Sequence, residues 1–357
     1  MRVAVDVNPL AGARTGVGTY LQHILTEMAL LPDAPDLIGL QLSLRSRTLR
    51  LADLRVRRVP VPAAALHMLW SRMPFPPVTA LTGRVDVVHG PNYVAPPAGR
   101  AATVITVHDL AYLRYPELVS AASLRYRELV PAAIRRGATV LTPSSTIADE
   151  VREAYRLDPE RVRPTPLGVD PGWSEAAAAA LPSEVGPDYL LFVGSREPRK
   201  NLGWLLDAYR QAARAAVELP QLVLVGPAGW GDQPNLGPRP PTVLGFTSGA
   251  ELRALVAGAK ALVSPSRYEG FGLTPLEALA AGTPVIASDI PVHHEVLGDC
   301  ARFVPLDDVD ALADALAHPP ARSAAQAAHG RARSGNFRWS KTAASTVSAY
   351  RFALESR

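Results

Sequence analysis

Short apolar runs alternate with helical stretches along most of this chain. The runs predict strands of parallel sheets, because parallel strands are buried on both faces. In the first half we expect strands at residues 3–7, 37–44, 85–88, 104–107 and 140–142. In the second half we expect them at 189–193, 222–225, 243–244, 261–263 and 285–287. This alternation is typical of the α/β class.

A Pro/Gly-rich stretch, residues 164–173, separates the two sets of strands and indicates a linker. We therefore expect two Rossmann-like domains, residues 1–168 and 169–339. A chain of 357 residues with 48% hydrophobic content suffices for two cores. No apolar run is long enough to span a membrane, and the chain enters a strand at once, so we expect a cytoplasmic protein. The single cysteine, Cys300, excludes an intrachain disulfide and a cysteine-based metal cage.

The most informative segment is residues 264–295, where Glu269 and Glu277 flank a Gly-Phe-Gly loop. Thr274 and Glu277 have capping-box spacing around Pro275, which predicts a helix beginning at Pro275. The free N–H groups of such a helix start suit a phosphate. An alternative is that Glu277 only caps the helix and that Glu269 is a solvated loop acid.

Three cations follow the predicted strand 189–193, namely Arg196, Arg199 and Lys200, and Asn201 then opens a helix. Cations at a helix start repel one another, and a bound diphosphate would relieve that cost. The alternative is an exposed basic turn. Which of the two arginines would meet a diphosphate stays open.

His108 lies at the carboxyl end of the predicted strand 104–107, where open α/β sheets bind ligands. It predicts a polar contact to a ligand, and His89 is a weaker candidate of the same kind. Residues 12–20 form a glycine-rich turn with Gly16 and Gly18, in which Arg14 is a candidate anion contact. This turn is not the G-x-G-x-x-G pattern, which argues against NAD.

No metal site is predicted. Asp308 and Asp310 match a D-x-D pattern, but they precede a helix, where acids serve as caps. His293, His294 and Glu295 lack zinc-ligand spacing. We expect no cofactor and no nucleic-acid partner.

A basic and apolar segment raises the question of membrane contact. It comprises Arg45, Arg47, Arg50, Arg55, Arg57 and Arg58, followed by residues 63–75 with Trp70. Such a segment could lie against an anionic membrane. The alternative, a solvated basic face followed by a helix packed on its own domain, stays open.

The segment from residue 264 to 295 resembles the E-x7-E signature of retaining glycosyltransferases of the GT-B fold, family 4. The Ser-Pro-Ser start, Glu-Gly-Phe-Gly, Pro-Leu-Glu-Ala and Ala-Gly-Thr-Pro-Val all agree with it. The resemblance implies that Glu269 binds donor-sugar hydroxyls and Glu277 the nucleotide ribose. It implies that the sugar and diphosphate meet the backbone of Phe271, Gly272 and Leu273.

The same resemblance extends to other elements. Glu-Pro-Arg-Lys-Asn matches a family turn in which an arginine and Lys200 stabilise the leaving diphosphate, and His108 matches the family's His-Asp pair. The loop with Gly16 and Gly18 would lie between acceptor and donor phosphates. Two Rossmann-like domains would face a central cleft, and the last helix, residues 340–357, would complete the first domain.

The implied activity is transfer of a hexose from a nucleotide sugar to a glycan or lipid-linked acceptor, with retention and without a metal. GDP-mannose is the favoured donor, because the Glu-Pro-Arg-Lys-Asn turn and the Trp70 region resemble bacterial mannosyltransferases. UDP-glucose or another UDP-hexose is the alternative. A nucleotide-sugar epimerase of the same fold, or an inactive nucleotide-sugar-binding protein, are further alternatives.

Overall fold

The chain forms two compact units in the computed structural model, which describes residues 1–12, 16–44, 48–49, 51, 54–175, 180–215, 218–231, 235–236 and 240–357. The N-terminal unit comprises Met1–Arg114, Ala121–Gly168 and Trp339–Arg357. The C-terminal unit comprises Tyr115–Ser120 and Val169–Arg338. The passage from one to the other after Gly168 falls inside the Pro/Gly-rich stretch 164–173.

The N-terminal unit is built on a parallel sheet whose described strands lie in the order β3-β2-β1-β4-β5-β6-β7. The strands are β1 (Arg2–Asp6), β2 (Asp36–Leu42), β3 (Arg55–Val59), β4 (Val87–Gly90), β5 (Ala102–Thr106), β6 (Thr139–Thr142) and β7 (Val162–Pro164). The α-helices are α1 (Gly16–Ala29), α2 (Ala63–Arg72), α3 (Val78–Thr82), α4 (Ala111–Arg114), α5 (Tyr126–Arg135), α6 (Ser145–Tyr155) and α13 (Trp339–Glu355). The strand order reverses direction between β1 and β4.

The C-terminal unit has a second parallel sheet, in the order β10-β9-β8-β11-β12-β13 over the described residues. Its strands are β8 (Tyr189–Val193), β9 (Gln221–Val225), β10 (Thr242–Leu244), β11 (Ala261–Ser264), β12 (Val285–Ser288) and β13 (Ala301–Val304). Its α-helices are α7 (Leu202–Ala215), α8 (Gly249–Gly258), α9 (Leu273–Ala280), α10 (Pro291–Leu297), α11 (Val309–Ala317) and α12 (Ala324–Ser334). Here the order reverses between β8 and β11.

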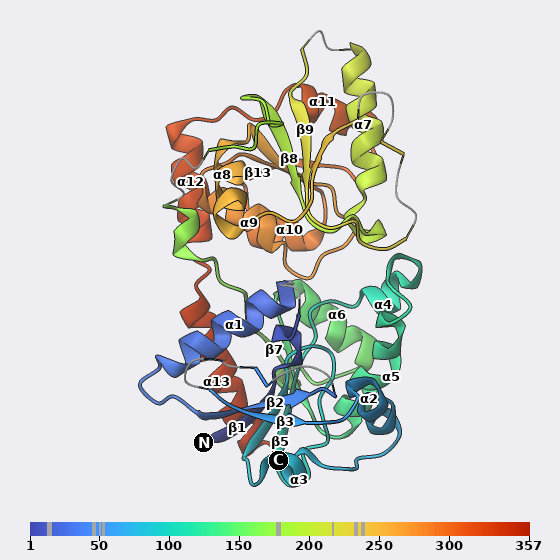
Figure 1. Ribbon diagram of the computed structural model, residues 1–357, viewed down its shortest axis with the longest axis vertical. Helices are drawn as coiled ribbons and strands as arrows, with labels where there is room; N and C mark the ends of the chain where they lie inside the picture. The colour runs from blue at the N-terminus through green and yellow to red at the C-terminus, as the bar shows by residue number, and fades with distance from the viewer. Residues whose placement is uncertain are drawn as a thin grey trace. The chain divides into compact units, whose positions relative to one another are not determined.

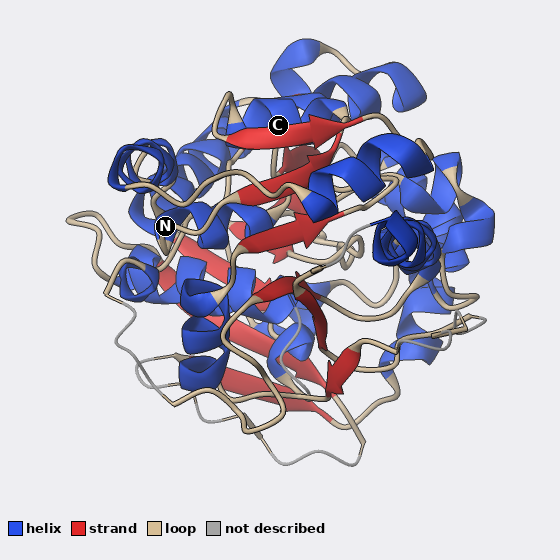
Figure 2. Cartoon of the chain, turned by 90° about the horizontal axis from the view of Figure 1, so that it is seen from above, coloured by secondary structure: helices blue, strands red, loops and turns tan. Residues whose placement is uncertain are grey.

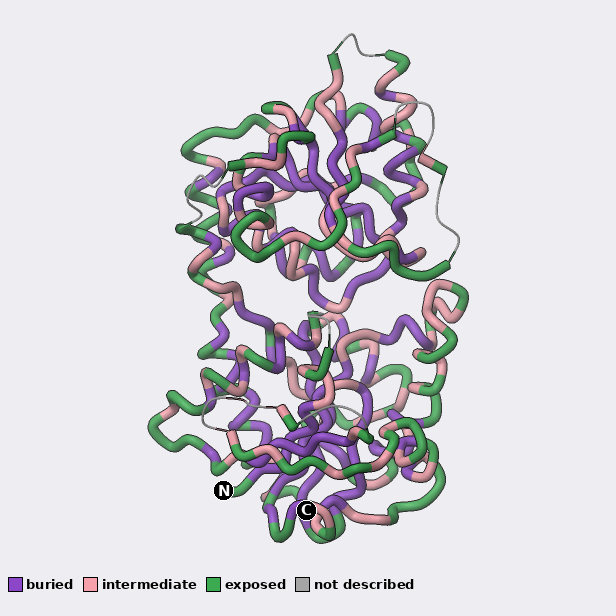
Figure 3. Tube along the Cα trace, viewed as in Figure 1, coloured by how far each residue is buried: buried purple, intermediate pink, exposed green. Residues whose placement is uncertain are grey.

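Helices cover both faces of each sheet, as parallel strands require (Figure 2). In the C-terminal unit α7 and α11 pack together on one face, and α9 and α12 pack together on the other (Figure 1). The buried parts of the trace follow the strands (Figure 3). Val3, Val5 and Val104, for example, have no exposed surface. Long apolar runs therefore form strands here because both strand faces are covered.

Helix α13 belongs to the N-terminal unit, where it packs against α1 and β5 (Figure 1). The ring of Trp339 stacks on His23 at 4.7 Å between centroids. The hydroxyl of Tyr350 lies 2.8 Å from Nδ1 of His89. The C-terminal end of the chain thus completes the unit that the N-terminal end begins.

Within the part of the chain that the structure describes, three strands were not predicted: β3, β7 and β13. Strand β3 has the sequence Arg-Val-Arg-Arg-Val and lies at the sheet edge, so its polar positions are exposed and its apolar run is broken. Strand β7 ends in Pro164, which an edge strand tolerates. Strand β13 also lies at a sheet edge, and Arg302 interrupts its apolar run. All three are thus edge strands without the uninterrupted apolar run used for prediction. No helix among the described residues combines the length and apolarity needed to span a bilayer.

Candidate functional site

Two loops of the C-terminal unit meet where its strand order reverses. Strand β8 leads into the turn 194–201, with the short 3-10 helix η6 (Pro198–Lys200), and its neighbour β11 leads into the loop 265–272. Ligands of open α/β sheets bind outside the carboxyl ends of strands at such a reversal. The topology therefore brings Lys200 and Glu269 together, although they are far apart in sequence.

Glu269 is the centre of this arrangement. Its side chain is 9% exposed. One oxygen, Oε1, accepts hydrogen bonds from Lys200 Nζ at 2.6 Å and from Ser266 Oγ at 2.7 Å. The other, Oε2, accepts one from Arg199 at 2.8 Å. Burial opposes ionisation of Glu269, but the charges of Lys200 and Arg199 outweigh it and hold the pKa below its ordinary value. The carboxylate is therefore ionised, and the solvated-acid alternative is wrong.

Arg199 is held by protein groups on several sides. It donates to the Tyr268 carbonyl at 2.7 Å and to Glu197 Oε1 at 2.7 Å, in addition to Glu269. The expectation that the cations of this turn repel one another without a ligand is wrong for Arg199 and Lys200, because Glu197 and Glu269 form ion pairs with them. Arg196 lines a pocket together with Asn201.

The predicted capping box does not form. Helix α9 begins at Leu273, two residues earlier than expected, and no side chain caps it. Gly272 is the N-cap with φ of 86°, a left-handed conformation that glycine adopts without strain. This turn sends the backbone into the helix before Thr274 is reached. Phe271 is buried and packs edge-on against Phe337 at 5.6 Å.

Glu277 consequently lies in the second turn of α9 and caps nothing. Burial raises its pKa from 4.5 to about 8; a hydrogen bond from Trp173 opposes this rise, and the charge of Asp170 adds to it. Trp173 belongs to the 3-10 helix η5 (Pro171–Trp173), which packs on α9. Glu277 is thus protonated at neutral pH, whereas Glu269 is ionised.

Sequence reasoning missed Ser266 and His293. Ser266 donates to the site carboxylate, and His293 lies in α10 with no exposed surface. Helix α10 follows β12, the neighbour of β11 in the sheet. A polar residue shortly after the strand beside β11 was therefore the available signal for His293.

In the N-terminal unit, Gly16 and Gly18 lie in the first turn of α1, which follows β1 at that sheet's reversal. Arg14 lies outside the described residues. His108 is half-buried, and its Nε2 donates to the Pro91 carbonyl at 2.8 Å. Burial lowers its pKa, against the Pro91 hydrogen bond and the Asp109 charge, which both raise it. The ring is thus neutral and leaves Nδ1 as an acceptor.

His89 is not a ligand contact in this structure. It is fully buried, and Nδ1 and Nε2 lie 2.8 Å from the hydroxyls of Tyr350 and Thr106, respectively. Both ring nitrogens therefore serve the packing of the N-terminal unit.

Trp70 is 1% exposed, so it belongs to the core and not to a surface patch. Its neighbours Met68, Met73 and Phe75 are 64%, 48% and 65% exposed. Arg58, on β3, donates to the carbonyls of Ser43 and Leu44. Arg45, Arg47 and Arg50 lie outside the described residues.

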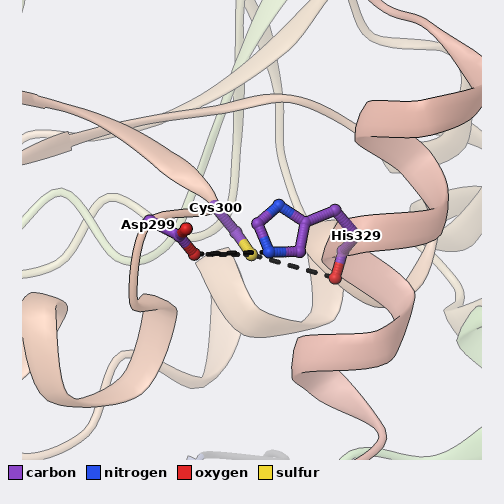
Figure 4. Close-up of side chains that lie close together, drawn as sticks. All are labelled: Asp299, Cys300 and His329. Carbon is purple, nitrogen blue, oxygen red and sulfur yellow. Dashed lines mark hydrogen bonds and ion pairs between the residues drawn. The ribbon is translucent and has the colours of Figure 1, made fainter.

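Asp308 caps helix α11, accepting from the Ala311 N–H at 2.9 Å, as expected. Within the described residues one group of side chains has the composition of a metal site: Asp299, Cys300 and His329 (Figure 4). His329 Nε2 lies 3.3 Å from Asp299, and both of these side chains are exposed. Burial, followed by the Asp299 charge, raises the pKa of the Cys300 thiol. These contacts join α12 to the turn after α10.

Two family models match the chain. The model described as "Glycosyl transferase 4-like domain" matches residues 15–168, and that described as "Glycosyl transferases group 1" matches residues 187–318. Together they span both units and include the turn with Lys200 and the loop with Glu269.

Among curated proteins, the chain is 28% identical to O-antigen chain mannosyltransferase B of Escherichia coli, over 98% of this chain and 100% of that protein. It is 32% identical to O-antigen chain mannosyltransferase RfbU of Salmonella typhimurium, over 57% of each. Among solved structures it superposes on sucrose-phosphate synthase from Thermosynechococcus elongatus with a TM-score of 0.75, 20% identity and 99% of each chain covered. It superposes on WaaG, a glycosyltransferase of lipopolysaccharide biosynthesis, with a TM-score of 0.67, 19% identity, and 97% of this chain and 99% of that one covered.

Proposed function

The chain belongs to the group 1, 4-like glycosyltransferases of the GT-B fold, and we propose that it transfers a hexose from a nucleoside diphosphate sugar to a hydroxyl of a glycan or lipid-linked acceptor. The observation that carries this proposal is the pairing of Glu269 with Lys200 in front of α9. An ionised carboxylate accepts hydrogen bonds from sugar hydroxyls, while an ammonium group and a helix start attract a diphosphate.

The chemistry follows from the charges that develop as the bond between sugar and diphosphate breaks. Negative charge grows on the leaving phosphate, and Lys200, Arg196 and the N-terminus of α9 stabilise it. The hydrogen bond from Lys200 to Glu269 fixes the ammonium group in position before the substrate arrives. Arg199 positions Glu269 from the other side.

We propose that the anomeric configuration is retained. Substitution takes place at the front face, and the leaving phosphate oxygen accepts the proton of the acceptor hydroxyl. Cations of the protein meet the diphosphate charge, so the reaction needs no divalent metal.

Mannose from GDP-mannose is the donor we propose. Support comes from the relatives: the two O-antigen enzymes are named mannosyltransferases, and one of them aligns with nearly the whole chain. UDP-glucose or another UDP-hexose is the alternative donor.

The first experiment measures thermal stabilisation of the purified protein by GDP, UDP, GDP-mannose, UDP-glucose and UDP-N-acetylglucosamine. We expect the largest rise in Tm with GDP-mannose. Release of GDP should then require a lipid-linked oligosaccharide acceptor and should persist in excess EDTA. Turnover of UDP-N-acetylglucosamine without an acceptor would instead identify an epimerase. Stabilisation without any turnover would identify an inactive binding protein.

A further inference from the structure

The buried histidine of α10 has a defined tautomer. Nδ1 of His293 lies 2.9 Å from the carbonyl oxygen of Ser288 and 3.3 Å from its hydroxyl oxygen. That hydroxyl donates its own proton to the Ser266 carbonyl at 2.5 Å. Both atoms facing Nδ1 are therefore acceptors, so Nδ1 carries the ring proton. Nε2 is left with a lone pair.

No donor among the described residues lies within hydrogen-bond distance of that lone pair. His293 has no exposed surface, and its Nε2 is buried without a hydrogen bond. Native structures rarely leave a buried acceptor unmet, because its desolvation is unfavourable. Burial also lowers the pKa of His293, although the Ser288 carbonyl and Glu269 oppose this. The ring is thus neutral, and Nε2 can accept but not donate.

The unmet nitrogen faces the glycine at the start of α9. A Cβ placed on Gly272 would lie 3.3 Å from Cδ2 and 3.6 Å from Nε2 of His293. Gly272 is the N-cap of α9, and no side chain caps that helix. The charges of Glu269 and Lys200 both act on the ring. His293 therefore borders the same site as the paired carboxylate.

The chemistry of Nε2 selects its ligand. Ionised phosphate oxygens are acceptors only, so they cannot satisfy a second acceptor. A sugar hydroxyl can donate to Nε2 and accept from a neighbouring N–H at the same time. We infer that His293 Nε2 accepts a hydrogen bond from one hydroxyl of the transferred hexose, forming a sugar subsite with Glu269. This inference rests on the proposed function and extends it to the part of the donor that His293 binds.

Deoxy donors test the contact directly. The wild type, His293→Ala and His293→Gln are assayed with the full nucleotide sugar and with analogues that lack one hydroxyl each. We expect one deoxy analogue to lower kcat/KM of the wild type about tenfold to a hundredfold. With the full nucleotide sugar, kcat/KM of His293→Ala should be lower than that of the wild type by a similar factor. With that deoxy analogue, kcat/KM of the variant should fall no further. His294→Gln, an exposed neighbour on the same helix, is the matched control and should behave as wild type.

Binding of free nucleoside diphosphate, which has ribose and phosphates but no transferred sugar, shows whether His293 contacts the sugar or the rest of the donor. The affinity for the free diphosphate should stay within about twofold of wild type in His293→Ala, because the contact is to the sugar. Weaker binding of the free diphosphate would overturn the inference, as would equal deoxy penalties in wild type and variant. If the wild type still transfers the sugar, either of these results overturns only the His293 contact and not the proposed function.

A measurement on the wild type tests the same contact without a variant, in case the His293 variants fail to fold. With ¹⁵N-labelled histidine, the Nε2 resonance should shift on adding the nucleotide sugar and not on adding the free diphosphate. No shift with a bound nucleotide sugar would overturn the contact.

Discussion

At the scale of single residues, the proposed role of Lys200 can be tested directly by mutation. Its ammonium group is held by Glu269 at 2.6 Å and should stabilise charge that grows in the transition state. We therefore expect Lys200→Ala to lower turnover about a hundredfold while weakening nucleoside diphosphate binding less. Steady-state kinetics and calorimetry measure the two effects.

Lys260→Ala is the control for this prediction, because Lys260 forms an exposed ion pair with Asp188. A turnover near that of the wild type in Lys200→Ala would remove Lys200 from the mechanism. The same result in both lysine variants would show that charge at Lys200 is not used.

Glu277 predicts a pH dependence of stability. In the folded chain the pKa of Glu277 is about 8, so the side chain keeps its proton up to that pH. In the unfolded chain its pKa has the ordinary value of 4.5, so it is ionised above that pH. Raising the pH through this range therefore favours unfolding. Glu277→Gln should remove that decline, so its free energy of unfolding relative to wild type should improve between pH 5 and pH 8. Urea denaturation at both values measures this, and parallel pH profiles would contradict the raised pKa.

The residue types of the site were predictable, but their pairing was not. The sequence places Lys200 and Glu269 at two strand ends, and only the sheet order shows that β8 and β11 are neighbours. Two of the three cations of the turn, Arg199 and Lys200, are therefore paired with carboxylates, which the sequence did not indicate. His293 was missed because its role depends on the orientation of its ring toward Gly272.

At the scale of elements, β3 and α2 carry the membrane hypothesis. Met68, in α2, and Phe75, which follows α2, expose 64% and 65% of their surface. In sequence both come after the basic strand β3. We expect Met68→Ser combined with Phe75→Ser to weaken sedimentation with vesicles of phosphatidylglycerol and phosphatidylcholine about tenfold. Phe246→Ser is the control, since Phe246 is 80% exposed but lies in the C-terminal unit. Equal binding of all variants, or none by the wild type, would refute membrane contact at this face.

The apolar pattern predicted where the strands and helices lie. Where each one begins and ends depends on the backbone conformation of single residues. Nearly every buried strand was located, because a strand covered on both faces must be apolar. The start of α9 was wrong because a left-handed Gly272 turns the chain earlier than the Thr274 capping pattern indicates. Local pattern does not show which of two possible helix starts the surrounding packing selects.

At the scale of the whole molecule, the chain passes between its units after Arg114, after Ser120, after Gly168 and finally after Arg338, where α13 returns to the N-terminal unit. The N-terminal unit is therefore complete only when α13 has docked. A buried hydrogen bond links α13 to β4: the hydroxyl of Tyr350 lies 2.8 Å from Nδ1 of His89, and neither side chain has any exposed surface. Removing that hydroxyl leaves a buried ring nitrogen without a partner.

We expect Tyr350→Phe to lower the free energy of unfolding by about 1–3 kcal/mol, the cost of an unmet buried polar group. Ser348→Ala on the exposed side of α13 should change it by less than about 0.5 kcal/mol. Urea denaturation gives both values, and hydrogen exchange should show the loss in β4 and β5 and not in β8 or β11. Equal stability of the two variants would mean that α13 is held by apolar packing alone. A loss confined to the C-terminal unit would contradict the assignment of α13 to the N-terminal one.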